Sequence, residues 1–141
     1  MGFSLIASAA ILGVTLFMAV EIITSDLLPT IEGVNDSYKE MKNRLTDQIQ
    51  TDINITDVIQ RVNESGYDYN ISVQNTGSVT LNTKEFIILI NGSERQTFCA
   101  SRYLYPENVA IFQVFNVTSA NPTRIKVVTN NGVADYYEYM S

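Results

Sequence analysis

Few side chains in this sequence have the chemistry that catalysis or metal binding requires. The 141 residues contain no histidine and a single cysteine, Cys99. Without histidine, these residues supply no imidazole base, no Ser–His or Cys–His nucleophile and no His-ligated zinc or haem. One cysteine excludes an intrachain disulfide and any metal centre that needs several thiolates. Because Cys99 follows Phe98 in an apolar, strand-like segment, we interpret it as an inert buried thiol.

Carboxylate pairs are the remaining candidates for chemistry. Asp52 with Asp57, and Asp135 with Glu138, lie along single predicted strands, so we expect solvated carboxylates rather than an acid–base pair. The glycines are isolated, which excludes a glycine-rich phosphate loop, and no Asp-x-Asp-x-Asp run indicates a Ca²⁺ loop. The formal charge of −6 disfavours nucleic-acid binding. We therefore expect no catalytic residue, cofactor or metal ion, and a protein that is not an enzyme.

The amino-terminal segment is uncharged, since Glu21 is the first charged side chain. As a helix, the apolar run 3–20 would be about 27 Å long, close to the hydrocarbon thickness of a bilayer. The hydroxyls of Ser4, Ser8 and Thr15 can bond to the helix backbone, so they are compatible with lipid. The predicted membrane-anchor side chains are Phe3, Leu5, Ile6, Ile11, Leu12, Val14, Leu16, Phe17 and Val20.

A buried core helix and a cleavable secretory signal are the alternatives for this run. No second segment is long and apolar enough to enclose a core helix. A secretory signal would have a basic n-region, a shorter apolar core and a small-x-small cleavage site. We favour a retained anchor, with the bulk of the chain outside the membrane.

Asn-x-Ser/Thr tripeptides support this outside location, because glycan acceptors belong on extracytoplasmic surfaces. The alternative is that an Asn- and Thr-rich β protein accumulates such tripeptides without using them. The six candidate acceptors are Asn35, Asn54, Asn63, Asn70, Asn91 and Asn116.

The hydrophobic pattern divides the chain into an anchor helix over 1–28, an amphipathic stalk helix over 29–50 and a β-sandwich over 51–141. Pro29 is expected to kink or break the helix, because its ring displaces a backbone hydrogen bond. The stalk stripe packs either on the downstream domain or on a partner helix, and the sequence leaves both open. Its side chains, spaced by three and four residues, are Ile31, Val34, Tyr38, Met41, Leu45 and Ile49.

Beyond residue 50 the hydrophobic period changes from 3.6 to 2. The segment 67–74 places Tyr67, Tyr69, Ile71 and Val73 on one face, and an irregularity is expected near Val58–Ile59 in the preceding strand. Turn residues at 63–66 and 130–132 predict β-hairpins. About six to eight short strands without intervening helices indicate an antiparallel, immunoglobulin-like β-sandwich that lacks the antibody disulfide and tryptophan.

The last predicted strand, 133–140, has one face for the core and one face that exposes Tyr136 and Met140. Tyrosine and methionine are enriched at protein interfaces, so these two residues are candidate interface positions. Ordinary packing of an edge strand is the alternative. The core face carries Val133, Asp135, Tyr137 and Tyr139.

One amino-terminal apolar helix followed by a β-sandwich is the plan of archaeal type IV pilin-like proteins. The runs that carry the resemblance are 51–55 (TDINI), 71–77 (ISVQNTG) and 86–92 (FIILING). The opening 1–4 (MGFS) and the run 124–137 (RIKVVTNNGVADYY) are most similar to archaellum accessory proteins of the FlaF family, with the FlaG family next.

This resemblance implies a structural component of the archaeal motility machinery. Such proteins are held in the cytoplasmic membrane by their helix and place the sandwich beneath the surface layer. There they bind surface-layer protein as a static anchor, or stator, and the family's sandwich can form a homodimer; other archaellum components are further expected partners.

The alternative is a pilin- or archaellin-like filament subunit that packs through its amino-terminal helix. Archaellins carry a short basic leader and a glutamate early in the mature helix. Here no basic leader is present and Glu21 lies at the far end of the apolar run. We therefore favour the fixed accessory protein.

Overall fold

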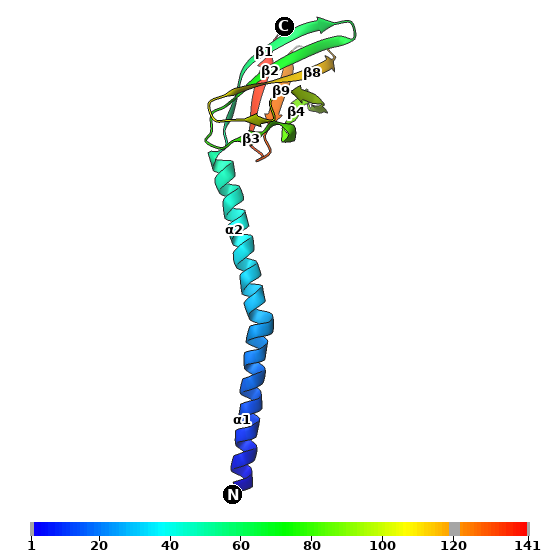
Figure 1. The fold of residues 1–141 in the computed structure, drawn as a ribbon. Coiled ribbons are helices and arrows are strands. Elements are labelled where there is room, and N and C mark those ends of the chain that lie inside the picture. The colour runs from blue at the N-terminus through cyan, green and yellow to red at the C-terminus, as the bar shows by residue number, and fades with distance from the viewer. Residues whose placement is uncertain (1, 119–121, 141) are drawn as a thin grey trace. The chain divides into compact units, whose positions relative to one another are not determined.

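The computed structural model describes residues 2–118 and 122–140, so Met1 and Ser141, which the predicted domain ranges include, lie outside the described residues. The chain divides into two compact units, Met1–Asn43 and Arg44–Ser141. The division falls inside the segment predicted as a stalk. A long helical segment is followed by antiparallel sheets, which confirms the predicted fold class (Figure 1).

The helical segment consists of α1 (Gly2–Ile22), a π-helical turn (Ile23–Leu27) and α2 (Leu28–Gln50). Pro29 does not break the helix, contrary to one of the two outcomes expected from the sequence. Proline has no N–H to donate, and the hydrogen-bond pattern changes in the turn before it, where the Leu28 N–H donates to the carbonyl of Ile23. The irregular turn contains the Ser25 carbonyl, which would accept from an N–H at position 29 in a regular α-helix.

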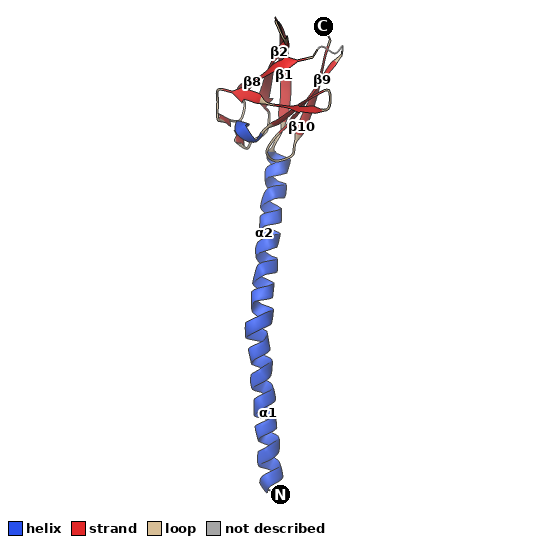
Figure 2. Cartoon of the chain, turned by 90° about the vertical axis from the view of Figure 1, so that its right-hand side faces the viewer, coloured by secondary structure: helices blue, strands red, loops and turns tan. Residues whose placement is uncertain are grey.

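Two four-stranded antiparallel sheets form the sandwich of the second unit (Figure 2). The first sheet has the order β1 (Ile53–Asn63), β2 (Gly66–Asn75), β8 (Val109–Val117), β6 (Thr97–Cys99). The second has the order β10 (Ala134–Tyr139), β9 (Thr123–Val128), β4 (Ile87–Ile90), β5 (Ser93–Arg95). A small ladder joins β3 (Leu81–Asn82) to β7 (Tyr103–Leu104), with a 3₁₀ turn at Thr83–Glu85.

The alternating pattern of the strands places one side chain in two inside the sandwich, where the apolar core lies. Tyr69, Ile71 and Val73 of β2 are fully buried, as the sequence predicted, and Tyr67 packs partly against the core. Phe86 stacks on Phe112 with ring centroids 5.1 Å apart. The other buried apolar residues are Ile53, Ile55, Val58, Leu81, Ile88, Ile90, Leu104, Ala110, Val114, Val117, Ile125 and Val127.

The turns have the chemistry that tight hairpins require. At the β4–β5 hairpin, Asn91 has φ 50° and Gly92 has φ 82°, the pair of positive values that a type I′ turn needs. The predicted hairpins at 63–66 and 130–132 are confirmed as the β1–β2 and β9–β10 connections. The β-bulge of β1 lies between Ile55 and Asp57, slightly earlier than the sequence suggested.

The Asn75-Thr76-Gly77 turn links the end of β2 to the residues directly before β1. The Asn75 side chain is fully buried; its amide nitrogen donates to the carbonyls of Val79 (2.8 Å) and Leu104 (3.0 Å), and its oxygen accepts from the Gly77 N–H (3.0 Å). The backbone N–H groups of Thr76 and Gly77 both donate to the Asp52 carbonyl. A Cβ on Gly77 would lie 2.6 Å from the Asp52 nitrogen and still closer to the Gln50 carbonyl oxygen, so no larger residue fits.

We predict that Asn75→Ala destabilises the fold by about 2–4 kcal/mol, because it leaves buried backbone groups without partners. The measurement is urea unfolding followed by tyrosine fluorescence. Gln74→Ala, at the half-buried neighbouring position, is the matched control and should change the unfolding free energy by less than about 1 kcal/mol. Equal losses in the two variants would contradict the role given to the Asn75 amide.

Candidate interaction surfaces

The carboxylates considered for chemistry bond instead to nearby backbone and hydroxyl groups. Asp52 accepts from the Thr76 hydroxyl (2.8 Å) and Asp57 from the Val58 N–H (2.9 Å). Asp135 is not solvated in the way the sequence suggested, because its Oδ2 accepts from the Ile55 N–H of β1 at 2.8 Å. Among the described residues, no three His, Cys, Asp or Glu side chains cluster in a way that could hold a metal ion.

Cys99, the single thiol, is half-buried rather than fully buried, and it packs against the core from β6. It also lines a hollow of about 390 Å³ beside Thr83 and Thr97. Cys99 thus serves as a packing side chain at the edge of the core.

The apolar side chains of α1 form the first exposed surface. All nine predicted anchor residues are exposed, from 52% at Val20 to 93% at Phe3. Two of the helix hydroxyls have partners within the helix, since Ser8 and Thr15 donate to the carbonyls of Ser4 and Ile11. By length and composition, the helical run Gly2–Gln50 contains the one candidate membrane span among the described residues.

A second exposed surface is the stripe of α2. In the first unit, Ile31, Val34, Tyr38 and Met41 are between 54% and 65% exposed. A stripe with three- and four-residue spacing suits a facing helix.

The third surface lies on the side of the second sheet that points away from the core. The partition of β10 follows the predicted alternation: Tyr137 and Tyr139 pack on the core, whereas Tyr136 and Met140 are 68% and 72% exposed. The register places Tyr136 opposite Lys126 of β9 and Lys126 opposite Leu89 of β4. The Lys126 ammonium lies 5.1 Å from the centroid of the Tyr136 ring, a cation–π arrangement.

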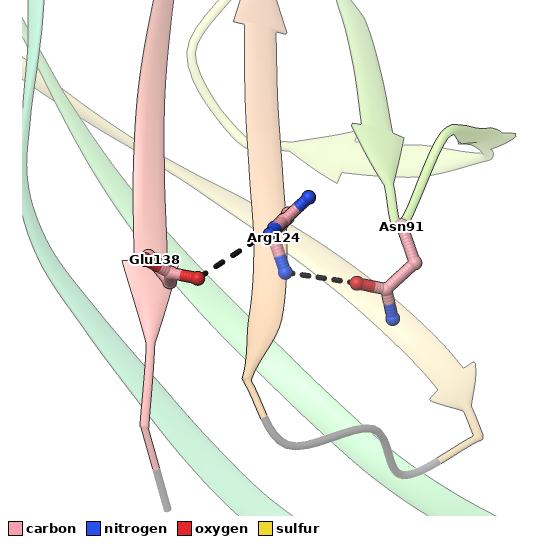
Figure 3. Close-up of polar contacts among 3 residues, drawn as sticks. All are labelled: Asn91, Arg124 and Glu138. Carbon is pink, nitrogen blue, oxygen red and sulfur yellow. Dashed lines mark hydrogen bonds and ion pairs between the residues drawn. The ribbon is translucent and has the colours of Figure 1, made fainter.

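Arg124 lies next to this row, between Glu138 of β10 and the end of β4 (Figure 3). Its Nε is 3.6 Å from the Glu138 carboxylate, and its side chain is 78% exposed. Its backbone is held more firmly, because the Asn91 N–H donates to the Arg124 carbonyl (2.8 Å) and the Arg124 N–H donates to Asn91 Oδ1 (2.9 Å). We call this surface the Arg124 face; it comprises Leu89, Arg124, Lys126, Tyr136 and Glu138.

Three adjoining hollows of about 470, 260 and 210 Å³ indent this surface, and Arg124 lines all three. Sequence reasoning identified Tyr136 but missed Arg124, Lys126 and Leu89. The alternation of β9 would have placed both cations on one face, but only the hairpin register shows which neighbours they meet.

The six candidate glycan acceptors lie in different environments. Asn35 and Asn54 are exposed, and Asn70 is half-buried within β2. The Asn63 amide nitrogen donates to Asp68, and the Asn116 oxygen accepts from the Ser65 hydroxyl. Asn91 borders the largest hollow of the Arg124 face.

Comparison with known proteins finds a likeness in fold. No family model matches the sequence, and no curated protein matches it. Among solved structures, the chain is similar to the archaellum periplasmic stator protein FlaG from Sulfolobus acidocaldarius, with a TM-score of 0.54 and 17% identity. The match covers 63% of this chain and 99% of that chain. At this identity the similarity shows that the two proteins share a fold.

We predict that Tyr136→Ala weakens partner binding but changes the unfolding free energy by less than about 1 kcal/mol, because the ring is mostly solvent-exposed. Tyr137→Ala, at the adjacent position that packs on the core, should cost about 2 kcal/mol or more. Thermal denaturation of the two variants makes the comparison. Equal destabilisation would mean that Tyr136 serves ordinary strand packing.

We also predict that the native protein carries a glycan on Asn54, whose side chain is exposed, and none on Asn63, whose amide nitrogen is engaged. Peptide mapping by mass spectrometry measures the occupancy of all six acceptors. Absence of glycan from every acceptor would show that the tripeptides are incidental to a composition rich in Asn and Thr.

Proposed function

We propose that this chain is a non-enzymatic structural component of the archaeal motility machinery. In this proposal α1 anchors it in the cytoplasmic membrane, and the β-sandwich lies outside, beneath the surface layer. The sandwich binds surface-layer protein and acts as a stator, with other archaellum components as neighbours and a homodimer as its expected assembly.

The observation that carries this proposal is the fold similarity to a protein whose name identifies it as an archaellum periplasmic stator. The exposed apolar surface of α1 supports the membrane attachment. Unsatisfied polar groups in lipid are costly, and the Ser8 and Thr15 hydroxyls have partners within the helix.

A stator needs mechanical attachment rather than chemistry. To resist the torque of a motor, it must be held at two points and must not deform between them. An anchor helix would supply one attachment. The sandwich, with its interlocked core and short turns, would supply a rigid body for the other.

The exposed stripe of α2 favours a second candidate, a pilin-like filament subunit. In such a filament the apolar helices of neighbouring copies would cover one another, instead of being covered by lipid. This assembly would explain a helix that is apolar on all sides in α1 and on one side in α2.

Shearing cells and separating filaments from envelopes distinguishes the two candidates. We expect the chain to remain with the envelope and to require detergent for extraction. An archaellin provides the matched control, because it should appear in the sheared filaments. Recovery of this chain in the filaments would overturn the stator proposal and support the filament subunit.

A further inference from the structure

The Arg124 face combines features that neither the fold nor the anchor helix explains. It is exposed, it is indented by three hollows around one arginine, and it holds an exposed tyrosine beside a lysine. Arginine and tyrosine are the residue types that contribute most to binding at protein interfaces. We propose that this face is where the sandwich docks its protein partner, and that the partner presents an acidic segment there.

Arg124 is the group on this face that would receive an acidic partner. Arg124 and Lys126 are neighbours on one face of β9, and the register places Glu138 beside Arg124 and Glu94 beside Leu89 on the same side of the sheet. The guanidinium has five N–H donors in a planar fork that suits a carboxylate. Among the described residues, Glu138 is the one acidic group recorded within 4 Å of it, and only Nε makes that contact, at 3.6 Å. The terminal nitrogens can therefore still receive a bidentate carboxylate.

The neighbouring groups hold the backbone of Arg124 and contact the ammonium of Lys126. Two hydrogen bonds to Asn91 fix the Arg124 backbone at the start of β9. The Tyr136 ring lies against the Lys126 ammonium at 5.1 Å, and Leu89 contributes an apolar wall to the smallest hollow. A partner segment with a carboxylate flanked by an apolar side chain could contact the cations and the apolar wall of Leu89 at the same time.

Glu138 is the acidic neighbour of Arg124 on this face. Its carboxylate lies 3.6 Å from Arg124 Nε in an exposed ion pair, and it would compete with an incoming carboxylate for the same guanidinium. Removing its charge should strengthen binding of an acidic partner, whereas it would weaken binding of a basic one. Glu138→Gln thus gives the sign of the partner's charge independently of Arg124.

This inference rests on the proposed function, because it places that function's partner on one face of the sandwich. The test uses the full chain in detergent micelles, with immobilised surface-layer protein as one probe and a fluorescent oligoglutamate peptide as another. An oligolysine peptide controls for non-specific attraction.

We expect Arg124→Glu to lower the affinity for both surface-layer protein and oligoglutamate about tenfold or more, and Glu138→Gln to raise it. Binding should also weaken as the salt concentration rises, since the face is exposed and screening is effective. The matched control is Arg102→Glu, which makes the same charge change at an exposed arginine outside the Arg124 face. Its guanidinium lies 5.6 Å from the centroid of the Tyr103 ring. It should leave both affinities unchanged. Unaltered melting temperatures would show that each variant is folded.

The outcomes separate the two proposals. If surface-layer protein binds equally well to Arg124→Glu and Arg102→Glu, the docking face is wrong and the proposed function stands. If surface-layer protein does not bind the wild type but oligoglutamate binds in an Arg124-dependent way, the face stands and the named partner is wrong. Failure of oligoglutamate to distinguish the variants, or a fully occupied glycan on Asn91 beside the largest hollow, would overturn the face.

Discussion

The buried amide of Asn75 is the interaction that ties the first sheet of the sandwich to the small β3–β7 ladder. A polar side chain with no solvent exposure is tolerated only when its hydrogen bonds are made, and here two backbone groups of the loop after β2 and one of β7 complete them. The same turn closes on the Asp52 carbonyl, just before β1 begins. The amide therefore holds together the end of β2, the loop that leads to β3 and the ladder strand β7. Without it, the start of β1 and the small β3–β7 ladder would lose their common support.

Much of the fold could be predicted because the determining patterns are local. The change of period from 3.6 to 2 after residue 50, and the Asn-Gly turns, locate the helices and hairpins without knowledge of tertiary contacts. The inward face of β10 followed from alternation alone. The continuity of the helix through Pro29 was not predictable in this way, because a π-helical turn lies within the range of local adjustments that a sequence pattern does not distinguish from a break.

The candidate site was harder to predict because it depends on register. Tyr136 could be placed on an exposed face from its own strand. Arg124 and Lys126 became part of the same surface only when the β9–β10 and β4–β9 pairings were known. Asp135 shows the same limit: it was assigned to the core face, but its hydrogen bond to Ile55 joins residues eighty positions apart. The spacing of residue types along the sequence does not indicate contacts between such distant residues.

The polar contacts between the two sheets have a consequence for how the sandwich resists sliding. Interdigitated apolar side chains oppose both separation and sliding of the two sheets, but their contacts are non-directional. The Tyr69 hydroxyl lies 3.1 Å from the Thr123 hydroxyl across the core, and the Asp135 carboxylate accepts from β1. These bonds are directional and buried or half-buried, so a lateral shift of one sheet would break them at once. Under mechanical load, the two sheets should therefore keep their relative position until the domain unfolds, rather than shift gradually against each other.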